Sequence, residues 1–263
     1  MLKFSANLSF LFADTPFSER FARAAGAGFA GVEFMSPYEY SPVEVAGWAK
    51  DVGVEVVLFN LPAGDWAAGE RGLACLPGRE TEFRAGVEQA LEYAEALACR
   101  RVHCLAGLRP EGEDEVRVSA CYLANLRHAA DRFASIGAQV LIEPINSRID
   151  MPGYWLDSLA RAFTLPGEID RPNVAVQFDA YHAAIIDGDP LPWLDARLAD
   201  IGHIQVADHP GRHEPGTGGV DFTAFFAFLE KSGYQGWVGC EYRPSQRTES
   251  GLGWLHPYRR SAR

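Results

Sequence analysis

Long uninterrupted hydrophobic runs are absent from this sequence. No window of its 263 residues approaches the roughly 18 consecutive apolar residues of a membrane-spanning helix. The amino-terminal stretch MLKFSANLSFLFADTPF has some character of a signal peptide, but Ser5, Asn7 and Ser9 interrupt its apolar part, and no small-x-small cleavage site follows. We therefore expect a protein with no membrane span, and we interpret this stretch as a first strand.

Paired cysteines and an excess of basic charge are also missing. The sequence contains five cysteines, at Cys75, Cys99, Cys104, Cys121 and Cys240. Their odd number and their lack of CxxC spacing argue against a disulfide framework and a structural zinc site, so we expect reduced thiols in the cytoplasm. The formal net charge of −11 opposes binding to nucleic acid or to an anionic membrane. We expect a small molecule as partner, and the formation of a homo-oligomer stays open.

Short apolar runs alternate with amphipathic stretches along the whole chain. The apolar runs read LKFSANL, AGVEFM, VEVVLFN, RVHCLAG, QVLIEPIN, NVAVQFDAYH, GHIQVAD and GWVGCEY. Between them lie helical patterns, among them residues 17–28, 41–53, 82–99, 119–137 and 221–233. Such alternation predicts parallel strands that are connected by crossover helices.

Eight such units predict an α/β fold, the (β/α)8 TIM barrel. Each unit averages about 33 residues, which is a usual size for one strand and its helix. A doubly wound open sheet is the main alternative, but such a sheet more often carries a glycine-rich phosphate fingerprint after its first strand, and NLSFLFAD has none. No linker or shift in composition divides the chain, so we predict a single domain over residues 1–263.

Acidic and amide side chains end the later strands. Because strand side chains alternate, Leu141 and Glu143 in VLIEP face the barrel interior together. The runs that follow carry Asp179, Gln205 and Glu241 at similar positions, and the active sites of such barrels lie at the carboxyl ends of the strands. One such residue alone would be typical of a solvated rim or a helix cap. Crowded carboxylates repel one another unless a cation lies between them, and an all-oxygen set favours Mg²⁺, with Mn²⁺ as the alternative.

Long and specific motifs run along the chain. They include FSANLSFLF, GFAGVEFMSPY, LFNLPAGDWAAGERGLACLPGRE, VHCLAG, LIEPIN, QFDAYHA, HIQVAD, RHEPGTG and GYQGWVGCEYRP. Through them the sequence resembles the hydroxypyruvate isomerase family, within the xylose-isomerase-like barrel superfamily. The resemblance implies an aldose-ketose type isomerase that converts hydroxypyruvate to tartronate semialdehyde through an enediolate, with a metal-assisted hydride shift as the other route.

The resemblance also implies roles for matching residues. It implies a metal site formed by Glu143, Asp179, Gln205 and Glu241, in which Glu143 and Glu241 are also the acid–base pair. His182 and Arg212 resemble substrate-oxygen contacts, and either would hold the substrate carboxylate. Two further candidates for substrate binding lie near strand ends, His103 and Asn60, although His103 could equally bond a neighbouring strand.

Two loops bear on access to this site. Residues 61–80 form the longest irregular stretch, rich in glycine and proline, and we predict a lid over the barrel mouth to which Glu70 and Arg71 contribute most. Family members tend to read GTGEIDF where this sequence has GTGGVDF, so Gly219 stands at an acidic position. Any contact made by that acid is lost here.

Three other functions compete with this interpretation. A related sugar-acid isomerase or epimerase, such as a 2-oxo-tetronate isomerase, would use the same residues. The apurinic-endonuclease branch of similar barrels needs a histidine-rich zinc cluster and a basic DNA face, which seven scattered histidines and the charge of −11 oppose. A barrel that binds an organic acid without catalysis would have little reason to keep all four presumed ligands.

Overall fold

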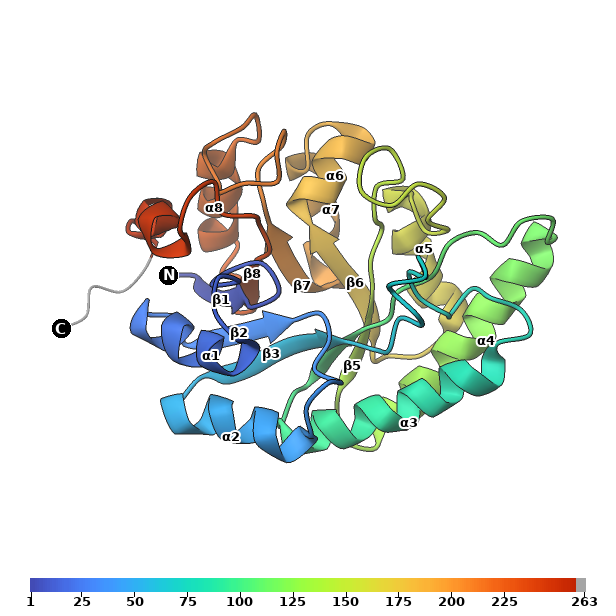
Figure 1. Cartoon of the computed structure of the whole chain (residues 1–263). Coiled ribbons are helices and arrows are strands. Elements are labelled where there is room, and N and C mark those ends of the chain that lie inside the picture. The colour runs from blue at the N-terminus through green and yellow to red at the C-terminus, as the bar shows by residue number, and fades with distance from the viewer. Residues whose placement is uncertain (259–263) are drawn as a thin grey trace.

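The chain forms a closed barrel of parallel strands with its helices on the outside (Figure 1). The computed structural model describes residues 1–258. The strands are β1 (Lys3–Asn7), β2 (Gly31–Phe34), β3 (Glu55–Asn60), β4 (Arg101–His103), β5 (Gln139–Ile142), β6 (Val174–Asp179), β7 (Ile201–Val206) and β8 (Trp237–Cys240). Each strand pairs with its neighbours in chain order, and β1 pairs with β8 to close the barrel.

Helices follow the strands and cover the barrel. Those within residues 1–258 are α1 (Phe17–Gly26), α2 (Pro42–Val52), α3 (Glu80–Ala96), α4 (Glu115–Ala134), α5 (Leu159–Ile169), α6 (Ala180–Asp187), α7 (Leu191–Arg197) and α8 (Phe222–Lys231), with the 3₁₀ helices η1 (Leu198–Asp200) and η2 (Thr248–Leu255). The (β/α)8 barrel expected from the sequence is confirmed. In this part of the chain no helix has the length and apolarity needed to cross a membrane.

Helix α2 shows how local sequence sets the ends of an element. The Ser41 side chain accepts a hydrogen bond from the Glu44 backbone N–H, and the Glu44 carboxylate accepts one from the Ser41 N–H, which together form a capping box. Pro42 occupies the first helical position, where its missing N–H costs nothing. Gly53 ends the helix with a φ of 71°, a left-handed conformation that glycine adopts without strain.

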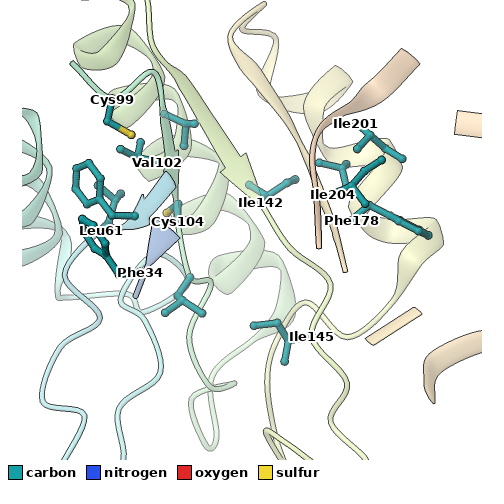
Figure 2. Close-up of a cluster of buried hydrophobic side chains, with 14 of the residues drawn as sticks. Phe34, Leu61, Cys99, Val102, Cys104, Ile142, Ile145, Phe178, Ile201 and Ile204 are labelled. Atoms are coloured by element: carbon teal, nitrogen blue, oxygen red, sulfur yellow. The ribbon is translucent and has the colours of Figure 1, made fainter. Parts of the chain in front are cut away.

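The outward faces of the strands form the main hydrophobic core against the helices. Val140 and Ile142 of β5 are fully buried in this cluster, as the alternation predicted, and Cys240 of β8 lies in it too. Figure 2 draws part of the cluster, with Val102 and Ile204 contributed by other strands. Burial of these side chains on one face leaves the other face of each strand for the barrel interior.

A small apolar plug fills part of the barrel interior. Leu141 packs there with Val57, Leu58 and Trp237, apart from the main core. A Cβ atom on Gly31 would lie 2.8 Å from Val57 and Trp237, so glycine leaves the space that the tryptophan ring needs. Because Trp237 is the first residue of β8, the plug lies toward the amino ends of the strands and leaves the carboxyl ends for polar groups.

A buried carboxylate begins the polar part of the interior. Glu33 on β2 accepts hydrogen bonds from the Ser5 hydroxyl at 2.7 Å and the Gln205 amide at 2.9 Å, and it contacts His203 Nε2 at 2.9 Å. A Cβ on Gly239 would lie 2.4 Å from both Glu33 carboxylate oxygens, so β8 needs glycine at this position. The Glu33 carboxylate thus supports the residues that lie nearer the barrel mouth.

Candidate active site

The predicted site residues surround one cavity at the carboxyl ends of the strands. Its volume is about 280 Å³, and Glu143, which follows β5, and Glu241, which follows β8, both line it. The four predicted substrate contacts also line it, namely Asn60, His103, His182 and Arg212. Asp179 and Gln205 are 2% and 1% exposed; Asp179 lies 3.7 Å from His182, and Gln205 donates a hydrogen bond to Glu241, both of which line the cavity.

Glu143 has one engaged and one free carboxylate oxygen. Its Oε2 accepts a hydrogen bond from Gln177 Nε2 at 3.0 Å and lies 3.4 Å from His103 Nε2. Its Oε1 is buried and has no hydrogen-bond partner among the described residues. Burial, with repulsion from Glu241 and Asp179, raises the Glu143 pKa well above its usual value. The group therefore holds a proton more readily than an ordinary glutamate.

Glu241 is held on both oxygens. Its Oε2 accepts hydrogen bonds from Asn7 at 2.7 Å and Gln205 at 2.6 Å, and its Oε1 accepts one from Arg212 at 2.7 Å. Burial raises its pKa to about 8, although the Arg212 charge opposes the shift. A carboxyl group that titrates near neutral pH is suited to general acid–base catalysis.

Asp179 joins a strand end to a helix start. Its Oδ1 accepts a hydrogen bond from the Tyr181 N–H, which caps α6, so β6 ends at Asp179, as the sequence predicted. Its Oδ2 is buried without a hydrogen-bond partner in residues 1–258 and lies 3.7 Å from His182 Nε2. Burial raises the Asp179 pKa to about 6.

A metal ion fits this group of donors. Glu143, Asp179 and His182 each offer one ligand atom, and these atoms lie within 4.8 Å of one another. The two unpartnered carboxylate oxygens described above both belong to this group. Mutual repulsion of buried carboxylates is relieved by a cation. This group shares Glu143 and Asp179 with the predicted ligand set and adds the imidazole nitrogen of His182, while the Gln205 Oε1 accepts a hydrogen bond from Gln177 at 2.7 Å.

Gln177 is a site residue that the sequence reasoning missed. Its Nε2 donates to both Glu143 and Gln205, and its buried Oε1 has no partner within the described part of the chain. It thereby links an expected base to an expected metal ligand. Its position two residues before Asp179 on β6 would have placed it on the interior face by the same alternation that located Glu143.

Arg212 interacts with three acidic side chains of the site. Its Nη2 donates to Glu241 at 2.7 Å and lies 3.7 Å from Asp179, and its Nη1 donates to Asp150 at 3.1 Å. Its guanidinium also stacks on Tyr181, 4.9 Å from the ring centre. Asp150 gave no signal in the sequence, because it lies in an irregular loop after β5 where no periodicity assigns a direction to its side chain.

The loop that carries Arg212 is anchored from within. The buried carboxylate of Asp208 accepts hydrogen bonds from the backbone N–H groups of His209, Gly216, Gly218 and Val220. Gly219 is exposed and donates its own N–H to the His209 carbonyl at 2.7 Å. The loop is therefore held by backbone contacts that require no acidic side chain at position 219.

The segment over residues 61–80 lies at the barrel mouth. Trp66 and Arg71 line the cavity, and the Arg71 guanidinium lies 4.0 Å from the Trp66 ring centre. Glu70 accepts a hydrogen bond from the Asp65 N–H at 2.6 Å and forms an ion pair with Arg79, so it braces the segment. A bridge between Gly72 and Ala106 ties the segment to the loop that follows β4.

Comparison with known proteins assigns the family. A family model described as xylose isomerase-like TIM barrel matches residues 21–258. The chain belongs to this family. The 2-oxo-tetronate isomerase of Cupriavidus necator is 48% identical over 98% of this chain and 99% of its own length. The hydroxypyruvate isomerase of Escherichia coli is 46% identical over 98% of this chain and 100% of its own.

A solved structure agrees with the fold of this xylose isomerase-like chain. The crystal structure of an AP endonuclease, family 2, from Brucella melitensis superposes with a TM-score of 0.95. The two chains are 48% identical, and the match covers 99% of this chain and 100% of the other. The likeness therefore extends over the whole barrel and its loops.

Proposed function

We propose that the chain isomerises a short hydroxy or oxo acid, first of all hydroxypyruvate to tartronate semialdehyde (2-hydroxy-3-oxopropanoate). The two curated relatives described above are named as isomerases and match the full length, so the chain is an isomerase. The alternative substrate is 2-oxo-tetronate, or another sugar acid that is isomerised or epimerised at the same carbons. The observation that supports acid–base chemistry is the pair of glutamates with raised pKa values at one cavity.

The reaction moves a carbonyl group between adjacent carbons. A proton leaves the carbon that carries the hydroxyl group, an enediolate forms, and a proton returns to the former carbonyl carbon while the hydroxyl proton changes oxygens. Glu143 and Glu241 are the groups that we assign to these proton transfers. The Glu143 carboxylate accepts only one hydrogen bond, on Oε2 from Gln177, within the described residues, and Arg212 orients Glu241 through its Oε1. Asn60, His103 and His182 would bind the substrate oxygens.

A divalent ion, Mg²⁺ first and Mn²⁺ second, fits beside the two glutamates. The proposed ligands are Glu143, Asp179, Gln205 and Glu241, with the His182 nitrogen close enough to join them. When bound, such an ion supplies positive charge that offsets the negative charge developing on the substrate oxygens. The predominance of oxygen donors favours a hard cation over zinc.

A nucleic-acid substrate is the second candidate, because the similar Brucella melitensis protein is named as an AP endonuclease. Two observations oppose it for this chain. The net charge of −11 disfavours a phosphate backbone, and the donor group found within residues 1–258 contains one histidine where a zinc cluster would need several. Cleavage of DNA that contains an abasic site, with no isomerase activity, would support this candidate instead.

Substitution of the two glutamates tests the proposed chemistry. Glu143→Gln and Glu241→Gln keep the shape and an oxygen donor but remove the base, so each should lower kcat by at least about 10²-fold, with a smaller change in KM. The exposed Glu92→Gln on α3 is the matched control and should leave kcat unchanged. Full activity in either site variant would remove that glutamate from the mechanism. Purified protein that turns over neither acid would favour a non-catalytic binding role.

A further inference from the structure

The floor of the cavity is a poor place for the substrate carboxylate. Glu143, Asp179 and Glu241 are crowded there, so a substrate carboxylate placed beside them would lie next to groups that carry negative charge when ionised. The cation at the floor, Arg212, already donates to Glu241 and to Asp150. Even with a divalent ion bound, the ion and Arg212 would supply three positive charges against the four carboxylates Glu143, Asp179, Glu241 and Asp150, so the floor offers a substrate carboxylate no net positive charge.

Arg71 provides an uncommitted cation at the cavity. Its Nη1 donates to the backbone carbonyls of Trp66 at 3.1 Å and Glu70 at 2.7 Å, and its guanidinium stacks on the Trp66 ring. No carboxylate pairs with it within residues 1–258, and its other guanidinium N–H groups have no partner there. Arg71 and Trp66 line the same cavity as Glu143 and Glu241.

The stacking arrangement prepares Arg71 for a planar anion. Two carbonyl contacts and the tryptophan ring fix the guanidinium before a ligand arrives, which lowers the entropy lost on binding. Trp66 is 41% exposed and lines the cavity, so the ring that holds Arg71 lies at the mouth. Arg243, after β8, also lines the cavity and forms no ion pair in the described part of the chain.

We propose that Arg71, held on Trp66, binds the substrate carboxylate at the cavity rim, with Arg243 as a second cation. Arg71 then selects acids over neutral sugars of the same length, while Arg212 orients Glu241. This assignment rests on the isomerase function proposed above. It places the carboxylate outward and the two reacting carbons toward the glutamates.

A neutral analogue separates charge recognition from catalysis. Dihydroxyacetone equals hydroxypyruvate with its carboxylate replaced by a hydroxymethyl group. We expect Arg71→Gln to raise KM for hydroxypyruvate about tenfold or more with a much smaller change in kcat, and to leave kcat/KM for dihydroxyacetone nearly unchanged. Arg71→Lys keeps the positive charge but lacks the planar guanidinium that can donate two hydrogen bonds to one carboxylate. Its affinity for hydroxypyruvate should therefore lie between those of Arg71→Gln and the wild type. The control is Arg84→Gln, which removes the same positive charge at an exposed position on α3.

Binding of tartronate, measured by calorimetry, tests the same contact without turnover. Arg71→Gln should weaken this binding by a similar factor, and a far-ultraviolet circular dichroism spectrum like that of the wild type shows that the fold is intact. An unchanged KM for hydroxypyruvate and an unchanged tartronate affinity would overturn the proposal, as would an equal loss for dihydroxyacetone. If wild-type protein isomerises neither acid, the proposed function fails, while tartronate affinity still decides whether Arg71 binds a carboxylate.

Discussion

Glu33 and Glu143 are both buried inside the barrel, but their surroundings set their protonation in opposite directions. Burial disfavours the charged form of each. For Glu33 this effect is outweighed by His203 and by hydrogen bonds from Gln205 and Ser5, so its pKa falls below the usual value. Glu143 faces Glu241 instead, and its pKa rises. The first is suited to a fixed structural anion and the second to a group that exchanges protons.

Gln177 allows a test of how the site holds Glu143. Gln177→Leu removes the amide that donates to Glu143 Oε2, so the Glu143 pKa should rise further and the acidic limb of the kcat profile should move to higher pH. We expect kcat at neutral pH to fall about tenfold, because less of the base is ionised. The pH profile of kcat is the measurement, with the exposed Gln246→Leu as control. A parallel drop in kcat at all pH values would assign Gln177 a purely structural role.

The sequence located some of these residues and missed others for physical reasons. Glu143 and Asp179 follow apolar runs, where alternation assigns a side-chain direction. Gln177 follows the same alternation but lies inside its strand. At such a position a glutamine is easily interpreted as an ordinary uncharged residue of the core. Asp150 reaches Arg212 from an irregular loop, and its direction depends on tertiary contacts such as the hydrogen bond from Asn146 at 2.8 Å. No local pattern encodes such a contact.

At the level of elements, helices with breaking residues were hard to recognise. Helix α5 contains Pro166 and Gly167, which usually indicate a turn, yet it continues to Ile169. Helices α6 and α7 are short, and α6 begins directly after β6, so the apolar run continues across the boundary. The five helices expected from clear amphipathic patterns overlap α1, α2, α3, α4 and α8. Strong periodicity was therefore the reliable signal.

The segment over the cavity is the element with the most direct role in access. Replacement of residues 64–71 by a glycine-serine linker of equal length removes Trp66 and Arg71 from the cavity and the brace formed by Glu70. We expect kcat/KM to fall at least about tenfold, because water enters and the substrate loses contacts. Steady-state kinetics measure the change. Replacement of residues 110–113, in the loop before α4, is the control, and an unchanged kcat/KM in the first variant would refute the lid.

For the whole molecule, the acidic interior predicts the response of metal-free protein to pH. Burial raises the pKa of Asp179 from 3.8 to about 6 and that of Glu241 from 4.5 to about 8. Between the unfolded and folded values, the folded state binds more protons, so the free energy of unfolding falls as pH rises. We expect chelated protein to lose stability, on the order of a few kcal/mol, between about pH 4 and pH 8.

A divalent ion should reverse that loss. Because the ion takes the place of the protons, its stabilising effect should increase with pH across the same range. Thermal unfolding of chelated protein, with and without added Mn²⁺ or Mg²⁺, measures both effects. A Tm that rises with pH in the absence of metal, or that does not respond to either ion at pH 8, would contradict the proposed metal site.

The barrel could be predicted from the sequence because each strand and helix gives a local signal. Eight such units in order leave few possible topologies for the sheet. The site could be predicted only in part, because its contacts join strands that are far apart in the sequence. Asn7 and Glu241, at opposite ends of the chain, share a hydrogen bond of 2.7 Å. Closure of the barrel places them side by side.

The central claim is that the chain isomerises a short oxo acid through proton transfer at two glutamates. Turnover of hydroxypyruvate and of 2-oxo-tetronate in D₂O, with Mg²⁺ or Mn²⁺ present and followed by NMR, tests this claim most directly. We predict that product forms from at least one acid and carries solvent deuterium on carbon, since an enediolate takes its proton from a group that exchanges with water. No product from either acid, or product that keeps all of its original carbon-bound hydrogen, would contradict it.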